Sequence, residues 1–158
     1  MTKRIHIRRA VEEDIPLIVQ FNQDMAWETE ALELENEILH EGVTALFNDP
    51  TKGFYVVGEI DNNVVGCLMI TYEWSDWRNG MFWWIQSVYV KKAYRRKGVF
   101  KTLYNYVKTI QVDQHEAIGL RLYVDSDNFN AQKTYRELGM QRTGYQLFEY
   151  ISAKEMNH

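Results

Sequence analysis

The sequence predicts a mixed α+β domain built around a twisted, mostly antiparallel sheet. Three strand-like apolar runs follow one another in the middle of the chain and are joined by short turns, which is typical of an antiparallel meander. The third run leads into an amphipathic helix and then into another half-buried strand, an order that predicts parallel pairing of these two strands. With two helical patterns before the meander and one near the end, the predicted order is β-α-α-β-β-β-α-β-α-β in a single domain, residues 1–158.

The N-terminal part is predicted to contain one strand and two helices. Residues 4–8 alternate apolar and polar side chains and predict a short strand. Acidic residues 12–14 are typical of a helix start, and apolar side chains at helical spacing continue to Met25. A second helix is predicted over residues 34–47, and residues 26–30 are expected to form an acidic, aromatic connection between the two helices.

The three strands of the meander come next. Residues 54–60 and 64–74 predict two strands, and the Asp61-Asn62-Asn63 sequence between them favours a hairpin turn. A second turn, over residues 75–80, leads into the third strand, residues 81–90.

The remaining elements alternate between helix and strand. A helix is predicted to begin just after Gly98, and a strand follows over residues 120–124. Asp127-Asn128 is a helix-start sequence, and Gly139 is expected to close that last helix. The chain is expected to end on a final strand, residues 145–151.

Composition limits the classes of function. The 158 residues are 46% hydrophobic, which fits one packed core, and the formal net charge of −4 argues against general binding to nucleic acid. No apolar run approaches the ~18 residues of a membrane span, so no membrane contact is expected. The single cysteine, Cys67, fits a reducing compartment, and a cytoplasmic location is expected. The four histidines show no metal-ligand spacing, so no metal is expected.

A short basic run lies where the third meander strand meets the next helix. A helix start offers unpaired backbone N–H groups and a partial positive charge, and a glycine there lets an anion approach the backbone closely. This pattern predicts a binding site for a pyrophosphate group, and a solvated basic loop is the plainer alternative. The residues concerned are Arg95, Arg96, Lys97, Gly98 and Lys101.

These residues resemble the pyrophosphate motif of the GNAT acyl-CoA-dependent N-acetyltransferases. That motif runs Gln/Arg-x-x-Gly-x-Gly/Ala at the start of the central helix, and residues 95–100 match it except that Phe100 replaces a small residue. A second block, residues 128–135 followed by Leu138-Gly139-Met140, is similar to the family's Asn-x-x-Ala-x-x-x-Tyr-x-x-x-Gly-Phe block, with Met140 in place of Phe. The two motifs occur in the family's order, and the resemblance covers nearly the whole chain.

The resemblance implies the GNAT fold and transfer of an acetyl group from acetyl-CoA to a primary amine by direct attack in a ternary complex. It implies that Tyr135 protonates the departing CoA thiolate and that the backbone N–H of Val88 polarises the thioester carbonyl. The plainer alternatives are a packed helix tyrosine, an ordinary paired strand and, for Asn128, a helix N-cap. The residues implied to bind acetyl-CoA are Val88, Tyr89, Val90, Arg95, Arg96, Lys97, Gly98, Val99, Phe100, Lys101, Asn128 and Tyr135.

A narrower resemblance, to diamine acetyltransferases, concerns the acceptor amine. Those enzymes carry three similar sequences: one like Trp27-Glu28, a hairpin like Thr71-Tyr72-Glu73-Trp74, and a strand near the end of the chain like residues 144–148. Those enzymes place an acid on the strand before the pyrophosphate loop, where this chain has Gln86, which cannot act as a base. The candidates for the general base are therefore Glu28, Glu73 and a water chain held by Gln86 or by tyrosine side chains. The residues expected to bind the acceptor are Glu28, Glu73, Trp74, Trp84 and Gln86.

The acceptor is therefore expected to be a small amine, such as a diamine, a polyamine or an amino-acid-like amine. Because neighbouring strand residues point to opposite faces, at most one of Trp83 and Trp84 can line its pocket. A protein lysine or N-terminal acetyltransferase is one alternative, and a catalytically weak acyl-CoA-sensing module is another because Gln86 replaces the acid. A homodimer is also expected, since many relatives in this family are dimers.

Overall fold

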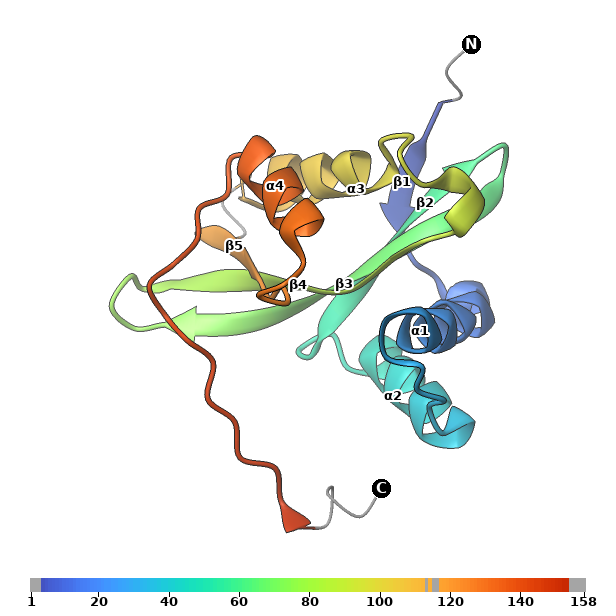
Figure 1. Cartoon of the computed structure of the whole chain (residues 1–158), viewed down its shortest axis with the longest axis horizontal. Coiled ribbons are helices and arrows are strands. Elements are labelled where there is room, and N and C mark those ends of the chain that lie inside the picture. The colour runs from blue at the N-terminus through green and yellow to red at the C-terminus, as the bar shows by residue number, and fades with distance from the viewer. Residues whose placement is uncertain (1–3, 113, 115–116, 154–158) are drawn as a thin grey trace. The chain divides into compact units, whose positions relative to one another are not determined.

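The computed structural model describes residues 4–112, 114 and 117–153, and the chain forms two compact units, Met1–Tyr123 and Val124–His158. None of the described helices is long and apolar enough to cross a membrane. The second unit holds helix α4 (Phe129–Glu137) (Figure 1). The elements of the first unit are β1 (His6–Arg9), η1 (Glu12–Asp14), α1 (Ile15–Glu30), α2 (Asn36–Asn48), β2 (Gly53–Ile60), β3 (Asn63–Ser75), β4 (Gly80–Val90), η2 (Lys92–Tyr94), α3 (Val99–Val107), η3 (Lys108–Val112) and β5 (Gly119–Leu122).

The first unit is built on a sheet whose described strands lie in the order β1-β2-β3-β4-β5. The first four strands are antiparallel to their neighbours, whereas β4 and β5 are parallel, with Phe82 opposite Gly119 and Ile85 opposite Leu122. The predicted α+β class, the antiparallel meander and the parallel pair are therefore confirmed.

The turn between β2 and β3 shows why the meander is readable from the sequence. Asp61 and Asn62 both have positive φ angles, 51° and 65°, and Ile60 pairs with Asn63 across the turn. Two successive left-handed residues are the hairpin geometry that matches the twist of the strands, and Asp and Asn tolerate it better than most residues. The predicted hairpin is confirmed.

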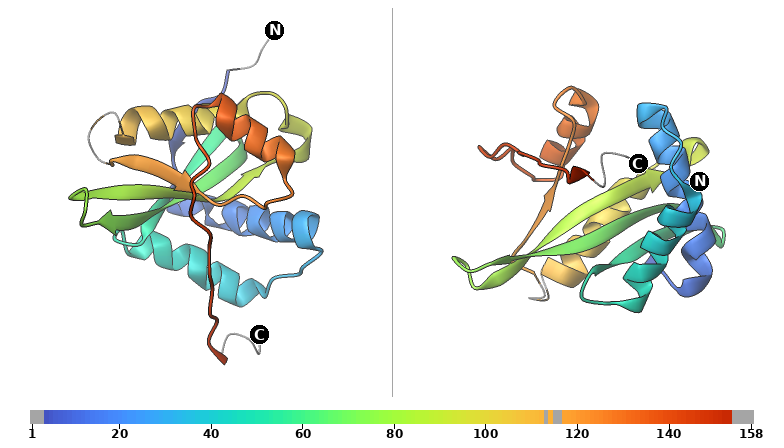
Figure 2. Two further views of the ribbon diagram at one scale, coloured as in Figure 1. Left: turned by 60° about the vertical axis from the view of Figure 1, so that its left-hand side comes forward. Right: turned by 90° about the horizontal axis from the view of Figure 1, so that it is seen from below.

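Helices cover both faces of this sheet, α1 and α2 on one face and α3 on the other (Figures 1 and 2). On the first face, Phe21 and Val43 belong to a buried cluster with Cys67 and Tyr89 of the sheet. On the other face, the Val99 side chain lies against Gly66, where an added Cβ would come within 3.1 Å of it. The position of α3 therefore depends on the small residue in β3.

Helix α1 is longer than predicted. It runs to Glu30, and Ala31, with φ 50°, ends it by donating its N–H to the Trp27 carbonyl at 3.0 Å. The prediction that residues 26–30 form a connection was wrong, because this stretch contains no Gly or Pro and continues the helix without a break. Glu28 consequently lies on the last turn of α1.

The predicted final strand is not formed. Residues 140–152, in red in Figure 1, adopt neither helix nor strand. An extended segment becomes a strand only when a neighbour supplies its hydrogen bonds, and the described part of the second unit contains only helix α4 as regular structure. The prediction of a strand at residues 145–151 was wrong for this reason.

Candidate active site

Strand β4 is interrupted by a bulge just before it leaves the sheet. Cys67 pairs with Tyr89 and Met69 pairs with Gln86, so one residue of β3 lies opposite both Ser87 and Val88. Ser87 has a φ of 50°, an unusual conformation for a serine, and such residues cluster at binding sites. Val88 therefore lies in a bulge and not in the ordinary paired strand that was the plainer alternative for this position.

The same part of β4 diverges from β5. Among the described residues, β4 pairs with β5 only as far as Ile85 and Leu122. Ile85 lies four residues before Tyr89 in β4. The β4 edge from Val88 to Val90 is therefore not covered by β5. Main-chain donors and acceptors on such an edge can pair with an extended ligand.

The turn after β4 has the backbone of an anion site. Arg96 and Gly98 both have positive φ angles, 63° and 82°, and Gly98 is the N-cap of α3. Thr102 donates to the Gly98 carbonyl at 3.0 Å as the first helical bond, which leaves the preceding N–H groups of the turn outside the helical hydrogen bonds. Successive backbone N–H groups in this conformation form a concave cradle for anions.

Arg95 points away from that cradle, toward β4 and α1. Its guanidinium donates to the Val90 carbonyl and to the Glu28 carboxylate, each at 2.9 Å, and lies 5.3 Å from the centre of the Tyr89 ring. The side chain of Arg95 therefore ties the basic turn to the end of α1. Sequence reasoning assigned Arg95 and Glu28 to different ligands, and the structure brings the two side chains together.

The Glu28 carboxyl is held in its ionised form by these contacts. Partial desolvation acts to raise its pKa, but hydrogen bonds from Arg95 and Tyr89 outweigh it, so the pKa lies below the usual range. Burial and the Glu28 hydrogen bond raise the pKa of Tyr89 in turn. A carboxyl with a lowered pKa is a weak base, so Glu28 is better suited to positioning than to proton removal.

A second group of predicted residues meets on one face of the sheet. Glu73 accepts hydrogen bonds from the indole N–H of Trp84 at 2.9 Å and from Arg121 at 2.8 Å, and Gln86 donates to Thr71. The hydrogen bond from Trp84 lowers the pKa of Glu73; desolvation acts to raise it, and the hydrogen bond and charge of Arg121 lower it further. Three of the residues predicted to bind the acceptor amine, Glu73, Trp84 and Gln86, therefore lie close together.

This cluster lies on the face of the sheet that α1 and α2 cover. Met69, which alternates with Thr71 and Glu73 along β3, packs against the buried cluster beneath those helices. Glu28, at the end of α1, is on the same side of the sheet. Trp74 alternates to the opposite face, so it does not join the cluster, and its part in acceptor binding remains a prediction.

The two neighbouring tryptophans of β4 point to opposite faces, as predicted. Trp83 is buried against the rings of Phe54 and Tyr72, whereas Trp84 packs against Tyr123 with ring centres 4.5 Å apart. Trp84 is therefore the one that faces the Glu73 cluster.

Arg121 is the residue that sequence reasoning missed. It lies opposite Trp84 in the parallel pairing, contacts Glu73, and stacks 3.6 Å from the centre of the Phe82 ring. Because Arg121 alternates with Leu120 and Leu122, the sequence places it on the more polar face of β5. The residues that it contacts depend on the register of β5 with β4, which the sequence does not show.

The second unit carries the two remaining predicted residues. The Asn128 side chain accepts a hydrogen bond from the Ala131 N–H at 3.1 Å, which confirms its role as the N-cap of α4. Tyr135 is half-buried, and burial raises the pKa of its phenol, so this side chain keeps its proton at neutral pH. That state is the one required of a proton donor.

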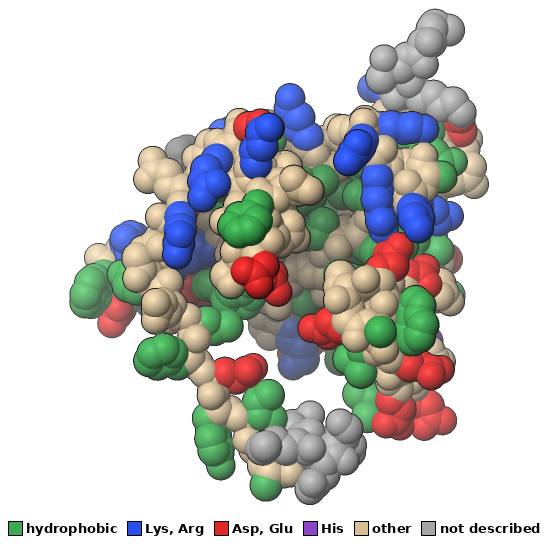
Figure 3. Space-filling view, viewed as in Figure 1, with side chains coloured by type: hydrophobic (Ala, Val, Ile, Leu, Met, Phe, Trp, Pro, Cys, Tyr) green, Lys and Arg blue, Asp and Glu red, His purple; other side chains and the backbone are tan. Residues whose placement is uncertain are grey.

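Charge is divided sharply between two segments of the first unit. The acidic segment, residues 24–41, has seven carboxylates and no Lys or Arg, while the basic segment, residues 91–108, has seven Lys or Arg and no carboxylate. Figure 3 shows carboxylates gathered over α1 and α2 and basic side chains over the turn into α3. The Glu28–Arg95 ion pair joins the two segments.

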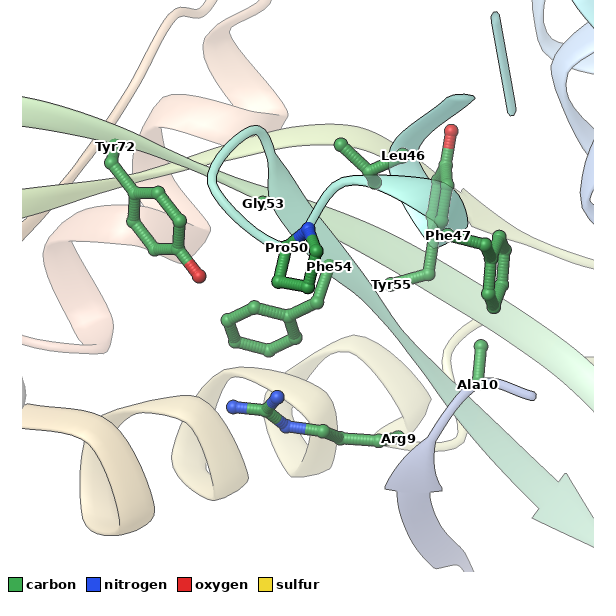
Figure 4. A pocket seen from close by; sticks show the side chains of 9 residues that line it. All are labelled: Arg9, Ala10, Leu46, Phe47, Pro50, Gly53, Phe54, Tyr55 and Tyr72. Carbon is green, nitrogen blue, oxygen red and sulfur yellow. The ribbon is translucent and has the colours of Figure 1, made fainter. Parts of the chain in front are cut away.

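A hollow of about 180 Å³ lies elsewhere in the first unit, beside the start of β2 (Figure 4). Arg9 lies over the Phe54 ring there, with its guanidinium carbon 3.9 Å from the ring centre, and Pro50 and Tyr72 are among the other residues that line the hollow. None of the residues predicted to bind acetyl-CoA or an amine lines this hollow.

Comparison with known proteins identifies the family. The sequence profile of the acetyltransferase (GNAT) family matches residues 17–140. The chain belongs to the GNAT acetyltransferase family. No curated protein matches it. This membership confirms the predicted fold and places the chain among acyl-transferring enzymes.

Solved structures agree with that assignment. A possible acetyltransferase from Clostridium difficile 630 is 49% identical, with a TM-score of 0.87 over 94% of this chain and 97% of that one. A predicted acetyltransferase with acetyl-CoA from Clostridium acetobutylicum is 16% identical, with a TM-score of 0.74 over 98% and 100% of the two chains. Aminoglycoside N-acetyltransferase AAC(6')-Iy in complex with CoA is 13% identical, with a TM-score of 0.77 over 96% and 97%. The last two share the fold.

Proposed function

We propose that this GNAT protein transfers the acetyl group of acetyl-CoA to the primary amine of a small cationic molecule, by direct attack in a ternary complex. One observation carries the proposal: the β4 bulge is followed directly by a basic turn with positive φ at Arg96 and Gly98. Two GNAT-fold structures that contain acetyl-CoA or CoA support the choice of co-substrate.

The chain's own residues fit acetyl-CoA. The β4 edge, Val88 to Val90, would pair with the pantetheine arm, and the N–H groups of residues 96–101 would bind the pyrophosphate with help from Lys97 and Lys101. Arg95 would hold the turn in place through Glu28 and the Val90 carbonyl. Asn128, already the cap of α4, is proposed to contact the pantetheine arm as well.

Acetyl-CoA supplies an activated thioester carbonyl. The amine nitrogen attacks its carbon, and the Val88 N–H stabilises the oxyanion, a contribution on the order of 3 kcal/mol for such donors. When the carbon–sulfur bond breaks, Tyr135 gives its proton to the CoA thiolate and recovers one from solvent. The raised pKa of Tyr135 means that the phenol carries this proton at neutral pH.

The acceptor site is proposed on the face that carries Glu73, Trp84 and Gln86. Carboxylates and aromatic faces both attract a protonated amine, and the acidic segment extends this attraction around the end of α1. Both candidate carboxylates, Glu28 and Glu73, have lowered pKa values, so they bind the cation and water carries away its proton. A diamine, a polyamine or an amino-acid-like amine fits these requirements.

Two other functions would use the same cofactor site. A protein acetyltransferase would prefer peptides over small amines, and an acyl-CoA-sensing module would bind acetyl-CoA without turnover, as the absence of a base at Gln86 allows. We further propose a single functional domain over residues 1–158, a homodimer and a cytoplasmic location, the last supported by a lone, buried cysteine.

The decisive experiment is a thiol-release assay with acetyl-CoA and a panel of diamines, polyamines, amino acids and lysine peptides. The proposal expects release of CoA thiol with a small di- or polyamine and a lower kcat/KM with peptides. Faster turnover with peptides would favour the protein acetyltransferase, and binding without any turnover would favour the sensing module.

A further inference from the structure

The last turn of helix α1 has a sequence that does not favour a stable helix end. It carries Glu28 and Glu30 and no Lys or Arg, although carboxylates are disfavoured at the negative end of a helix dipole. The next residue, Ala31, has a φ of 50°, which is strained for a residue with a Cβ. Contacts from other residues must therefore hold this end of α1 in place.

Gln23, one turn before the end of α1, supplies such a contact. Its side-chain N–H donates to the Leu34 carbonyl at 2.9 Å, and its side-chain oxygen accepts from the Leu34 N–H at 3.1 Å. One carboxamide thus pairs with both backbone groups of one residue, as a neighbouring strand would. We call this pair of hydrogen bonds the Gln23 clamp. A glutamate lacks the N–H donor and an asparagine is one methylene shorter, so the clamp requires glutamine.

The Gln23 clamp ties the connection between α1 and α2 back onto α1. Earlier in this connection, the N–H of Ala31 donates to the Trp27 carbonyl at 3.0 Å, and the N–H of Leu32 donates to the Ala26 carbonyl at 3.2 Å. With the clamp at Leu34, residues 31–34 are bonded to the last two turns of α1. These turns cannot unwind without breaking the bonds, so the clamp opposes local opening of the helix end.

The end of α1 in turn holds the basic turn, through Glu28. The Glu28 carboxylate accepts hydrogen bonds from Arg95, at 2.9 Å, and from Tyr89. The Tyr89 ring lies against Phe21 of the same helix, with ring centres 5.2 Å apart. Arg95 directly precedes the left-handed residue Arg96. A displacement of the helix end would therefore take Glu28 away from Arg95 and loosen the turn. All of these residues belong to the first unit.

We propose that Gln23 is a positioning residue for the acetyl-CoA site. The Gln23 clamp holds the end of α1, and Glu28 at that end holds Arg95 and the turn that binds the pyrophosphate. The inference rests on the proposed function for the identity of this ligand. A turn that is already held in its binding conformation loses less freedom when the ligand arrives, so the clamp strengthens binding from outside the site.

Nuclear magnetic resonance of the ligand-free protein tests whether the clamp reaches the turn. Gln23→Met keeps the length of the side chain and removes both hydrogen bonds, so the Leu34 amide should exchange about 10-fold faster. The order parameters of the backbone N–H groups of residues 96–98 should fall from the rigid value of about 0.85 toward about 0.6. Gln20→Met, the same change at a side chain that bonds to Asp24 within α1, should alter neither quantity. Unchanged exchange at Leu34, or unchanged order parameters in the turn, would contradict the proposal.

Calorimetric titration with acetyl-CoA tests whether the clamp acts through Glu28. Gln23→Met and Glu28→Met should each raise the Kd about 3- to 10-fold, and the double variant should bind no more weakly than Glu28→Met alone, because both changes interrupt one series of contacts. A wild-type Kd in Gln23→Met, or effects that multiply in the double variant, would overturn the proposal. If the wild-type protein bound no acetyl-CoA, the proposed function would fail, and the measurements on the ligand-free protein would still decide whether Gln23 holds the turn.

Discussion

The acidic segment of residues 24–41 and the basic segment of residues 91–108 have the same length and the same number of charges, with opposite sign. Their backbones differ. The acidic segment consists mostly of helix and has one left-handed residue, Ala31, at the end of α1, whereas the basic segment has two, Arg96 and Gly98, directly before α3. The basic segment can therefore offer a cradle of main-chain N–H groups to an anion, whereas the acidic segment offers carboxylate side chains to a cation.

This difference teaches something about specificity. A main-chain site is fixed by the fold, so it suits the co-substrate that all members of a family share. A side-chain site changes with each substitution, so it suits the acceptor that distinguishes one member from another. The Glu28–Arg95 ion pair connects the two and makes the position of the turn depend on the end of α1.

The largest loss of activity is expected at Tyr135, which belongs to neither segment. Tyr135→Phe should lower kcat about 100-fold while leaving both KM values nearly unchanged, because it removes the phenolic proton and keeps the ring that would contact acetyl-CoA. Steady-state kinetics with the best amine measures this, and Tyr106→Phe on α3 serves as the control. An unchanged kcat would remove the acid role of Tyr135.

Reversing one charge in the basic segment should come next. Lys97→Glu should raise the KM for acetyl-CoA about 10-fold or more, since a hydrogen bond to a charged group is worth about 1.5–3 kcal/mol. The KM for the amine should change little. Arg4→Glu makes the same change of charge at an exposed position outside both segments. Equal effects of the two variants would mean that only net charge matters.

The backbone of the basic turn can be tested separately from its charge. At Gly98 an added Cβ would meet no atom within 4 Å, so Gly98→Ala costs only the strain of a left-handed alanine, about 1–2 kcal/mol. We expect a roughly 5- to 30-fold rise in the KM for acetyl-CoA, or an equivalent loss of stability. Gly42→Ala, also unobstructed but within α2, should stabilise the protein by about 0.5–1 kcal/mol in thermal unfolding. Matching behaviour of the two variants would contradict the special role of the turn.

A smaller effect is expected on the acidic side. Glu73→Gln keeps the shape of the side chain and removes the charge beside Trp84 and Arg121, so it should raise the KM for the amine about 3- to 10-fold. The KM for acetyl-CoA should not change. Glu13→Gln is the control of equal charge. If Glu73→Gln instead affected only acetyl-CoA, the proposed division between the two segments would be wrong.

The smallest effect is the one that Glu28 and Glu73 should have on the pH dependence of kcat/KM for the amine. Because the pKa values of Glu28 and Glu73 are lowered, both carboxyls are ionised throughout the neutral range and contribute no inflection there. The logarithm of kcat/KM for the amine should therefore rise by about one per pH unit between pH 6 and 9, as an amine of pKa ~10.4 loses its proton. An inflection between pH 5 and 8 that disappears in Glu73→Gln would make Glu73 the base.

Much of this arrangement was predictable from local sequence. The Asp-Asn turn fixed the hairpin of β2 and β3, the glycine after the basic run marked the start of α3, and Asn128 marked the start of α4, because each residue acts on its own backbone. The partners of Glu28, Glu73 and Arg121 were not predictable, since they depend on how far α1 extends and on the register of β4 with β5. The final segment was misjudged for the same reason: alternation describes a chain that can form a strand, and the strand still needs an edge to join.

Calorimetric titration of the wild-type protein with acetyl-CoA tests the central claim most directly, because it asks only whether the basic turn binds the co-substrate. The account predicts one acetyl-CoA per chain, with affinity that falls as salt rises and falls further in Lys97→Glu. The absence of binding at high micromolar acetyl-CoA, with the protein folded, would contradict it.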